Sequence, residues 1–246
     1  MKILAIGNSF SQDATAYIED MAASAGVTDI IAANLYIGGC PLSHHAENLG
    51  TNTPDYDYER HAKGLYKTSI RDALRSDKWD IITVQQVSSD SGFYETYHPH
   101  LEIVLREVKA ECPDARIYFH RTWAYEEGSG HGAFPRYNRD RVTMDNAIEA
   151  VYQRLSKEYG LSIIPSGNVI TALKKLPEFD ITAGGISLYR DAFHMSYSYG
   201  RYAAAATWLK TLCNFDLNKV SFLPEGANAE LAEIVKRTVE TVCKKD

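Results

Sequence analysis

Short apolar runs alternate along this chain with longer stretches in which apolar residues recur every three to four positions. The runs have the length of buried strands, and the longer stretches have the period of amphipathic helices. The five predicted strands are Ile3–Ile6, Ile30–Ile37, Ile81–Val84, Ile117–Phe119 and Ser162–Ile164. The predicted helices are Asp13–Ala25, Tyr66–Ser76, His100–Glu111, Arg139–Tyr159, Asn168–Lys175, Tyr199–Cys213 and Asn228–Cys243.

Strands that alternate with helices in this way predict a parallel sheet with helices on both faces. We therefore expect an α/β fold, a flavodoxin-like three-layer α/β/α sandwich with a central five-stranded parallel sheet, forming a single domain over residues 1–246. Ligands of such folds bind beyond the carboxyl ends of the strands. Two long irregular stretches, Gly38–Gly64 and Arg121–Asn138, follow strands and are expected to wall that edge.

Composition narrows the classes of partner. The 246 residues are 45% hydrophobic and carry a net charge of −6, which disfavours nucleic acid and anionic membranes as main partners. No run approaches the roughly 18 apolar residues of a transmembrane helix, and the N-terminus has no secretory pattern. We expect a cytoplasmic protein, or a secreted or periplasmic one if a leader was removed; a homo-oligomer stays open.

Ser9 stands where the first predicted strand passes into a helical pattern. One interpretation is that Ser9, Ser11 or Asp13 caps that helix. The other is that the turn presents the Ser9 hydroxyl where free N–H groups and the helix dipole favour a developing anion. The G-x-S-x-G elbow of the α/β-hydrolases is absent.

Asp191 and His194 lie three residues apart near the other end of the chain, just before an alanine-rich helical stretch. That spacing can bring a carboxylate against an imidazole. Such a carboxylate orients the ring and stabilises the imidazolium that forms when histidine takes a proton from serine. An Asp near a His is often only structural, but the three together favour a catalytic set of Ser9, His194 and Asp191.

These segments resemble the motifs of the SGNH (GDSL-like) hydrolase superfamily, whose members are esterases and lipases with a flavodoxin-like fold. AIGNSFS resembles the first block, with Ser9 as nucleophile and Asn8 where many members carry Asp. RDAFHMS resembles the last block, which supplies the acid Asp191 and the base His194. LYIGGCPLSHH resembles the glycine block and implies that the Gly39 N–H lies in the oxyanion hole. With WDIITVQQVS and GRYAAAATW, the chain resembles one bacterial branch that has long been labelled uncharacterised.

The third block departs from the superfamily pattern. It usually reads G-x-N-D, with the Asn side chain donating to the oxyanion, whereas the matching stretch here is TVQQVSSDSG. A Gln amide can donate the same bond from one methylene further back. We assign the oxyanion hole to the N–H groups of Ser9 and Gly39 and the side-chain amide of Gln86. Gln85 and Ser89 are the alternatives, because strand-end register is set only to within about one residue.

Three further residues are expected at the substrate. His45 is chosen because a His recurs there in the related branch, and Trp123 and Tyr125 because they follow a strand. Tyr outnumbers Phe sixteen to eight, which favours aromatic rings with polar tips that can stack on sugars, although ordinary packing also explains aromatics. The adjacent pair His44–His45 lacks metal-ligand spacing, so we expect no metal and no organic cofactor.

The expected function is that of a carboxylic ester hydrolase, a serine esterase that removes short acyl groups, above all acetyl, from a carbohydrate or related small ester. One alternative is a carbohydrate-binding protein on the same scaffold that has lost catalysis. Another is a hydrolase of a different ester class, such as a lipid or thioester. The lack of a long apolar lid segment disfavours the lipase.

Overall fold

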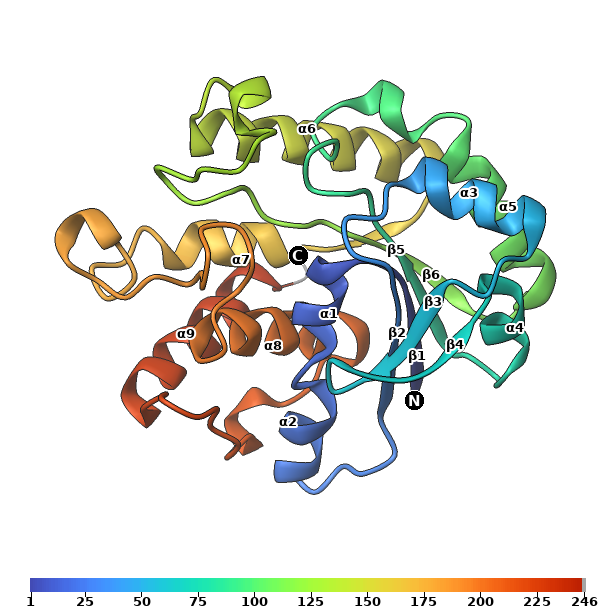
Figure 1. Cartoon of the computed structure of the whole chain (residues 1–246). Coiled ribbons are helices and arrows are strands. Elements are labelled where there is room, and N and C mark those ends of the chain that lie inside the picture. The colour runs from blue at the N-terminus through green and yellow to red at the C-terminus, as the bar shows by residue number, and fades with distance from the viewer. Residues whose placement is uncertain (245–246) are drawn as a thin grey trace.

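A mixed β-sheet runs through the middle of the molecule in the computed structural model, which describes residues 1–244 (Figure 1). Within these residues the sheet has seven strands, in the order β4-β3-β2-β1-β5-β6-β7. The strands are β1 (Lys2–Gly7), β2 (Ile31–Tyr36), β3 (Tyr56–Arg60), β4 (Lys63–Thr68), β5 (Ile81–Val84), β6 (Arg116–His120) and β7 (Ser162–Ile164). The predicted count of five is therefore wrong: an antiparallel hairpin of β3 and β4 extends the edge beside β2.

The remaining five strands are mutually parallel and coincide with the five predicted runs. Their spatial order puts the first strand between the second and third, as in a flavodoxin-like sheet. In β1, Ile3 pairs with Ala32 on one side and with Ile81 on the other, and Ile3 and Leu4 have no exposed surface. Strands covered on both faces read as continuous apolar runs, which is why the sequence revealed them.

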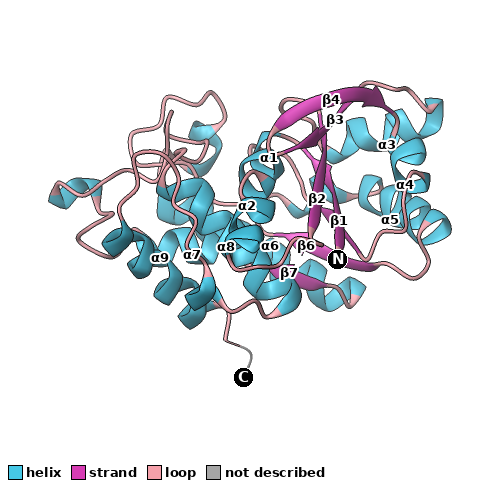
Figure 2. Ribbon diagram, turned by 90° about the horizontal axis from the view of Figure 1, so that it is seen from below, coloured by secondary structure: helices cyan, strands magenta, loops and turns pink. Residues whose placement is uncertain are grey.

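Helices cover both faces of the sheet (Figures 1 and 2). One layer consists of α1 (Ser9–Thr15), α2 (Ile18–Ser24), α7 (Ser166–Leu173), α8 (Tyr199–Cys213) and α9 (Ala229–Val242), which pack mainly around α8. The opposite layer consists of α3 (Leu42–Thr51), α4 (Ile70–Arg75), α5 (His100–Glu111) and α6 (Arg141–Tyr159). Short 3₁₀ turns occur at Tyr94–Tyr97, Phe134–Tyr137, Ile181–Ala183 and Leu217–Lys219.

Three predicted elements differ from the structure. The predicted helix Asp13–Ala25 is two helices, α1 and α2, which are separated at Ala16 and Tyr17. The predicted helix Tyr66–Ser76 begins as strand β4 and becomes helical only after Ser69 caps α4. The stretch Gly38–Gly64, expected to be irregular, contains α3 and β3.

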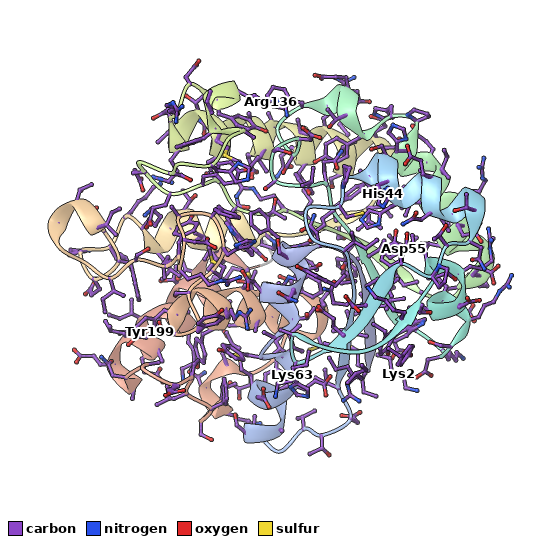
Figure 3. All side chains as sticks on the ribbon, in the orientation of Figure 1. Lys2, His44, Asp55, Lys63, Arg136 and Tyr199 are labelled. Atoms are coloured by element: carbon purple, nitrogen blue, oxygen red, sulfur yellow. The ribbon has the colours of Figure 1, made fainter. Side chains whose placement is uncertain are left out.

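The carboxyl ends of the parallel strands form one edge of the sheet, where β1 passes into α1 and β2 into the loop before α3 (Figure 1). Side chains fill the layers between sheet and helices on both faces, and the partly buried His44 lies near the start of α3 (Figure 3). In the part of the chain that is described, no helix is both long and apolar enough to cross a bilayer.

Candidate active site

Ser9 is the first residue of α1, at the carboxyl end of β1. Gly7 is needed there because a Cβ on it would lie 2.2 Å from Ser11 Oγ. Asn8 caps the helix. Its side-chain Oδ1 accepts the backbone N–H of Phe10 at 3.0 Å, and its backbone N–H donates to Ser11 Oγ at 3.0 Å. Asn8 and Ser11 therefore supply the cap, and the Ser9 hydroxyl is left for another partner.

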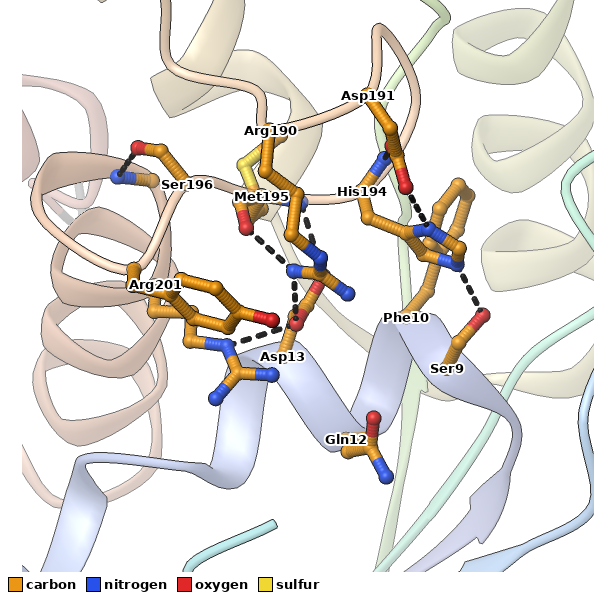
Figure 4. A network of polar contacts seen from close by, with 12 residues as sticks. Ser9, Phe10, Gln12, Asp13, Arg190, Asp191, His194, Met195, Ser196 and Arg201 are labelled. Atoms are coloured by element: carbon orange, nitrogen blue, oxygen red, sulfur yellow. Dashed lines mark hydrogen bonds and ion pairs between the residues drawn. The ribbon is translucent and has the colours of Figure 1, made fainter. Parts of the chain in front are cut away.

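That partner is His194 (Figure 4). The distance from His194 Nε2 to Ser9 Oγ is 2.9 Å, and His194 Nδ1 lies 2.7 Å from Asp191 Oδ2. The other oxygen of Asp191 accepts the backbone N–H groups of Phe193 at 3.3 Å and of His194 at 2.7 Å. Burial alone would raise the pKa of Asp191, but the hydrogen bonds from the ring and backbone of His194 hold that pKa below its ordinary value. The structure thus brings together three predicted residues from opposite ends of the chain.

Helix α1 also holds the segment that carries His194 (Figure 4). Asp13, one turn after Ser9 and fully buried, accepts the backbone N–H of Met195 at 2.8 Å. The same carboxylate accepts Arg190 at 2.8 Å and Arg201 Nε at 2.8 Å. One buried carboxylate therefore fixes the distance between the helix that begins with Ser9 and the segment that carries Asp191 and His194.

The opposite side of that segment is held by the loop after β6. Trp123 Nε1 donates to the Phe193 carbonyl at 2.8 Å, and the Glu126 amide donates to the Ala192 carbonyl at 2.8 Å. Between the acid and the base, Ala192 has a φ of 67°, a left-handed conformation that costs a residue with a Cβ about 1 kcal/mol or more. The flanking hydrogen bonds offset this cost.

A cavity of about 370 Å³ opens in front of Ser9 and His194. Its walls come from the ends of β1, β2 and β5 and from the two loops after β6 and before α8. The lining residues are Asn8, Ser9, Phe10, Tyr36, Gly38, Gly39, Val87, Ser88, Ser89, His131, Phe193 and His194. The predicted site residues Ser9, Gly39 and His194 are among them.

Two backbone amides at this cavity suit an oxyanion. The Ser9 N–H belongs to the first turn of α1, where helix geometry provides no acceptor. Gly39 lies in an exposed turn with a φ of 63°, a conformation that favours glycine. Both residues line the cavity beside the Ser9 hydroxyl.

The side chains of Gln85 and Gln86, which follow β5, do not point toward the cavity as the predicted role in the oxyanion hole requires. Gln86 is buried, and its Nε2 donates to the Thr96 carbonyl at 2.9 Å, away from the cavity lining. Gln85 is buried as well, and its Nε2 donates to Asn8 Oδ1 at 2.8 Å. Both side chains are buried and outside the cavity lining, and each donates to a partner inside the protein, so neither is placed as an oxyanion donor. Of the three candidates, Ser89 is the one that lines the cavity.

The three expected substrate contacts are also placed elsewhere. His45 has no exposed surface, and its Nδ1 lies 2.8 Å from the Tyr56 hydroxyl beneath α3. Trp123 is fully buried and holds the acid–base segment. Tyr125 is fully buried too, with its hydroxyl 2.9 Å from Ser88 Oγ. All three side chains are buried within the protein and none lines the opening.

His131 and Tyr36 line the cavity and were not singled out from the sequence. His131 comes from the irregular stretch after β6 that was expected to wall the site, and its ring packs 4.9 Å from that of Phe193. Burial, together with the nearby His194, lowers the pKa of His131. The sequence offered one signal for His131, its position in a loop that follows a strand. That signal indicated that the loop borders the site, but not which of its side chains does so.

Across residues 1–244, no group of three or more His, Cys, Asp or Glu side chains is arranged to hold a metal ion.

Sequence comparison identifies the family. The model of a family described as "Domain of unknown function (DUF4886)" matches residues 2–242. The chain belongs to this family. A solved DUF4886 family protein from Bacteroides uniformis is 30% identical, with a TM-score of 0.89 over 100% of this chain and 97% of that one. A search of the curated proteins found no match.

More distant structures share the fold of this DUF4886 protein. An acetylxylan esterase from Geobacillus stearothermophilus, solved as a catalytic mutant, is 15% identical, with a TM-score of 0.58 over 88% of this chain and 95% of that one. A lipase/acylhydrolase from Enterococcus faecalis is 14% identical, with a TM-score of 0.57 over 89% and 97%. Other similar structures carry the terms SGNH hydrolase and GDSL-like lipase in their names. The resemblance to the SGNH superfamily is therefore confirmed, at the level of the fold.

Proposed function

We propose that this protein is a serine esterase that removes short acyl groups, acetyl in preference, from a carbohydrate or a related small ester. The observation that carries the proposal is the hydroxyl–imidazole–carboxylate contact of Ser9, His194 and Asp191, with successive distances of 2.9 and 2.7 Å. Both distances lie within the hydrogen-bond reach that a nucleophile and its general base require.

The reaction begins when His194 Nε2 takes the proton of Ser9 Oγ as that oxygen attacks the ester carbonyl. Asp191 accepts from Nδ1, which fixes the tautomer and stabilises the imidazolium. The carbonyl oxygen becomes an oxyanion facing the Ser9 and Gly39 amides, and the positive end of α1 favours that charge. Each such donor is worth about 3 kcal/mol of transition-state stabilisation.

Collapse of the tetrahedral intermediate breaks the bond to the alcohol. His194 returns its proton to the leaving oxygen, and Ser9 keeps the acyl group. Water then repeats the cycle: His194 takes its proton, the hydroxide oxygen attacks the acyl carbon, and the acid leaves with Ser9 Oγ reprotonated.

The cavity supports a small acyl group and a polar alcohol. Its volume of about 370 Å³ is at the lower end for ligand sites. The hydroxyls of Ser88 and Ser89, the His131 ring and the Phe193 ring all border it, a mixture of polar groups and aromatic faces that suits a sugar. The shared fold with acetylxylan esterases adds support at the level of analogy.

The test is hydrolysis of p-nitrophenyl esters of increasing acyl length. We expect the highest kcat/KM for acetate and a steep fall beyond about four carbons, because the cavity is small. Ser9→Ala should lose about 10³-fold or more in kcat. Ser24→Ala is the matched control, since Ser24 bonds only to the Met21 carbonyl and to the segment at Ser221, far from the cavity.

Equal turnover by the wild type and Ser9→Ala would remove Ser9 from the chemistry. No turnover of any ester, with retained binding of oligosaccharides, would favour the carbohydrate-binding alternative. A rate that rises with acyl length would indicate the lipid hydrolase instead.

A further inference from the structure

The residues from Ile37 to Leu42, here called the glycine loop, carry the Gly39 amide. The Cys40 amide closes a tight turn onto the Ile37 carbonyl at 3.3 Å, with Gly39 inside it. Gly39 itself is exposed and left-handed, and the direction in which its N–H points in the molecule depends on how the whole turn is seated against the neighbouring strands. Contacts from outside the loop must set that direction.

Two side-chain amides make such contacts. Asn8 Nδ2 donates to the Cys40 carbonyl at 3.1 Å, one residue beyond Gly39. Gln86 Oε1 accepts the Leu42 amide at 2.8 Å, at the start of α3. The glycine loop is therefore held at both of these points by side chains from the ends of neighbouring strands.

The Asn8 side chain is in turn held by a buried chain of hydrogen bonds. Gln85 Nε2 donates to Asn8 Oδ1 at 2.8 Å, and Gln85 Oε1 lies 2.7 Å from His120 Nδ1. His120 Nε2 lies 3.1 Å from Ser166 Oγ, at the first turn of α7. Asn8 and Gln85 are 2% exposed, and His120 and Ser166 have no exposed surface.

The direction of every bond in this chain is determined by chemistry. A Gln oxygen only accepts, so His120 carries its proton on Nδ1 and Nε2 accepts from the Ser166 hydroxyl. Burial lowers the pKa of His120 to about 3, so the ring is neutral at physiological pH. Rotating the Gln85 amide would place its oxygen against Asn8 Oδ1, which is fixed as an acceptor by the Phe10 amide.

Gln86 is fixed just as firmly. Its Oε1 accepts the amides of Leu42 and Val87 at 2.8 and 2.9 Å, and its Nε2 donates to the Thr96 carbonyl and hydroxyl at 2.9 and 3.2 Å. Both protons of the Gln86 amide are therefore used inside the protein.

We propose that Gln85 and Gln86 are positioning residues that orient the Gly39 N–H toward the oxyanion, Gln85 through Asn8 and Gln86 directly through the glycine loop. The inference rests on the proposed esterase function. It reverses the role expected from the sequence, in which one of these glutamines donates to the oxyanion itself.

The test uses Gln85→Glu, which keeps the size of the side chain but removes the donor to Asn8 Oδ1, and Gln86→Met, which keeps its length but removes the acceptor of the Leu42 amide. With p-nitrophenyl acetate, we expect kcat to fall about 10-fold in each, less than the roughly 100-fold of a lost oxyanion donor, with KM within about twofold. In ¹⁵N–¹H spectra, the Gly39 amide resonance should shift or broaden in both variants. Gln12→Glu is the matched control: Gln12 donates to Glu59 at 2.7 Å, so the change costs stability without touching the glycine loop.

The two readouts separate the alternatives. If Gln86→Met lowers kcat while the Gly39 resonance stays in place and Gln85→Glu is unaffected, Gln86 is the donor and the proposal is overturned. An unmoved Gly39 resonance in both variants overturns it as well. The spectra give this answer even if the wild type hydrolyses no ester, which would count against the proposed function alone.

Should Gln85→Glu fail to fold, Gln85→Met and Ser166→Ala serve in its place. Gln85→Met removes the amide without adding charge, and Ser166→Ala removes only the outermost bond of the chain. The Gly39 resonance should then move more in Gln85→Met than in Ser166→Ala. No movement in either variant would contradict the proposal.

Discussion

Asn8 carries an amide at a position where many members of the SGNH superfamily carry a carboxylate, and its surroundings require the amide. Its nitrogen faces the Cys40 carbonyl at 3.1 Å, while its oxygen accepts Phe10 and Gln85. An ionised Asp would set a negative oxygen against that carbonyl in a site that is 2% exposed. The side-chain nitrogen of Asn8 is therefore the atom that attaches the glycine loop to the turn before Ser9.

Asn8→Asp should be destabilising in a pH-dependent way. Burial against a carbonyl raises the folded-state pKa of the new carboxyl above its unfolded value of about 3.9, because only the protonated acid can donate to Cys40. The variant's melting temperature should thus match the wild type below about pH 4 and fall behind it as pH rises through the folded-state pKa.

Thermal melts of both proteins from pH 4 to 8 provide the measurement. Asn228→Asp is the control, because exposed Asn228 caps α9 by accepting the Leu231 amide, which a carboxylate does equally well. A melting-temperature difference that is constant with pH would show that the Asn8 amide is not needed as a donor.

The contact among Ser9, Asp191 and His194 could be predicted because it depends on short motifs and on chain order around the sheet. The role of Gln86 could not be predicted from the sequence. A glutamine that donates to an oxyanion and a glutamine that holds a loop differ only in the direction in which the side-chain amide points. That direction is decided by Leu42 and Thr96, which lie on other elements and have no local signal in the sequence.

At the scale of elements, the segment that carries Asp191 and His194 has no regular structure and is held between α1 and the loop after β6. Its attachment to α1 depends on Asp13, which has no exposed surface and faces Arg190 and Arg201. Removing one member of a buried ion pair leaves the others uncompensated and typically costs about 3–5 kcal/mol.

Asp13→Asn should lower the free energy of unfolding by about 3 kcal/mol, near the lower end of that range because Arg190 is partly exposed. It should also lower kcat with little change in KM, since the bond that it weakens sets the Ser9–His194 distance rather than a substrate contact. Denaturant unfolding and steady-state kinetics measure the two effects. Asp77→Asn, which breaks a half-exposed pair with Lys2 at the other edge of the sheet, should change neither by much. A stable Asp13→Asn protein with normal kcat would show that the tether is dispensable.

The β3–β4 hairpin shows why some elements escape prediction. β4 is exposed along most of its length, so it lacks the alternation or the apolar run that marks a strand. Its turn uses His61 and Ala62, both with positive φ, where Asn-Gly or Asp-Gly would have signalled a hairpin. Both signals were absent, and the helical period of the following residues was extended into the strand.

At the scale of the whole molecule, acid stability depends on two buried histidines. His45 and His120 have no exposed surface, and burial lowers the pKa of each to about 3. In the unfolded chain a histidine titrates near 6.5, so the unfolded state binds protons first as the pH falls. The stabilisation is complete above about pH 6.5 and is lost progressively down to about pH 3.

Each of these histidines should lower the folding equilibrium constant by about tenfold per pH unit within that window. Denaturant unfolding at pH 7, 6, 5 and 4 gives the slope for the wild type and for His45→Gln and His120→Gln. Each substitution should flatten the slope by about one proton, whatever it does to stability at pH 7. An unchanged slope in His120→Gln would mean that its ring is charged in the native protein.

Ser9 and His194 are separated by 185 positions in the chain yet share one hydrogen bond. A nascent chain emerging from the ribosome therefore holds its nucleophile early and gains its base only when four-fifths of the polypeptide has been made. The Ser9–His194 contact requires the complete tertiary fold, whereas a helix can form from neighbouring residues alone. A refolding protein should therefore regain its helices before it regains activity. Under the proposed function, a partly synthesised chain would be inactive, because Ser9 lacks its base until His194 has been made and placed beside it.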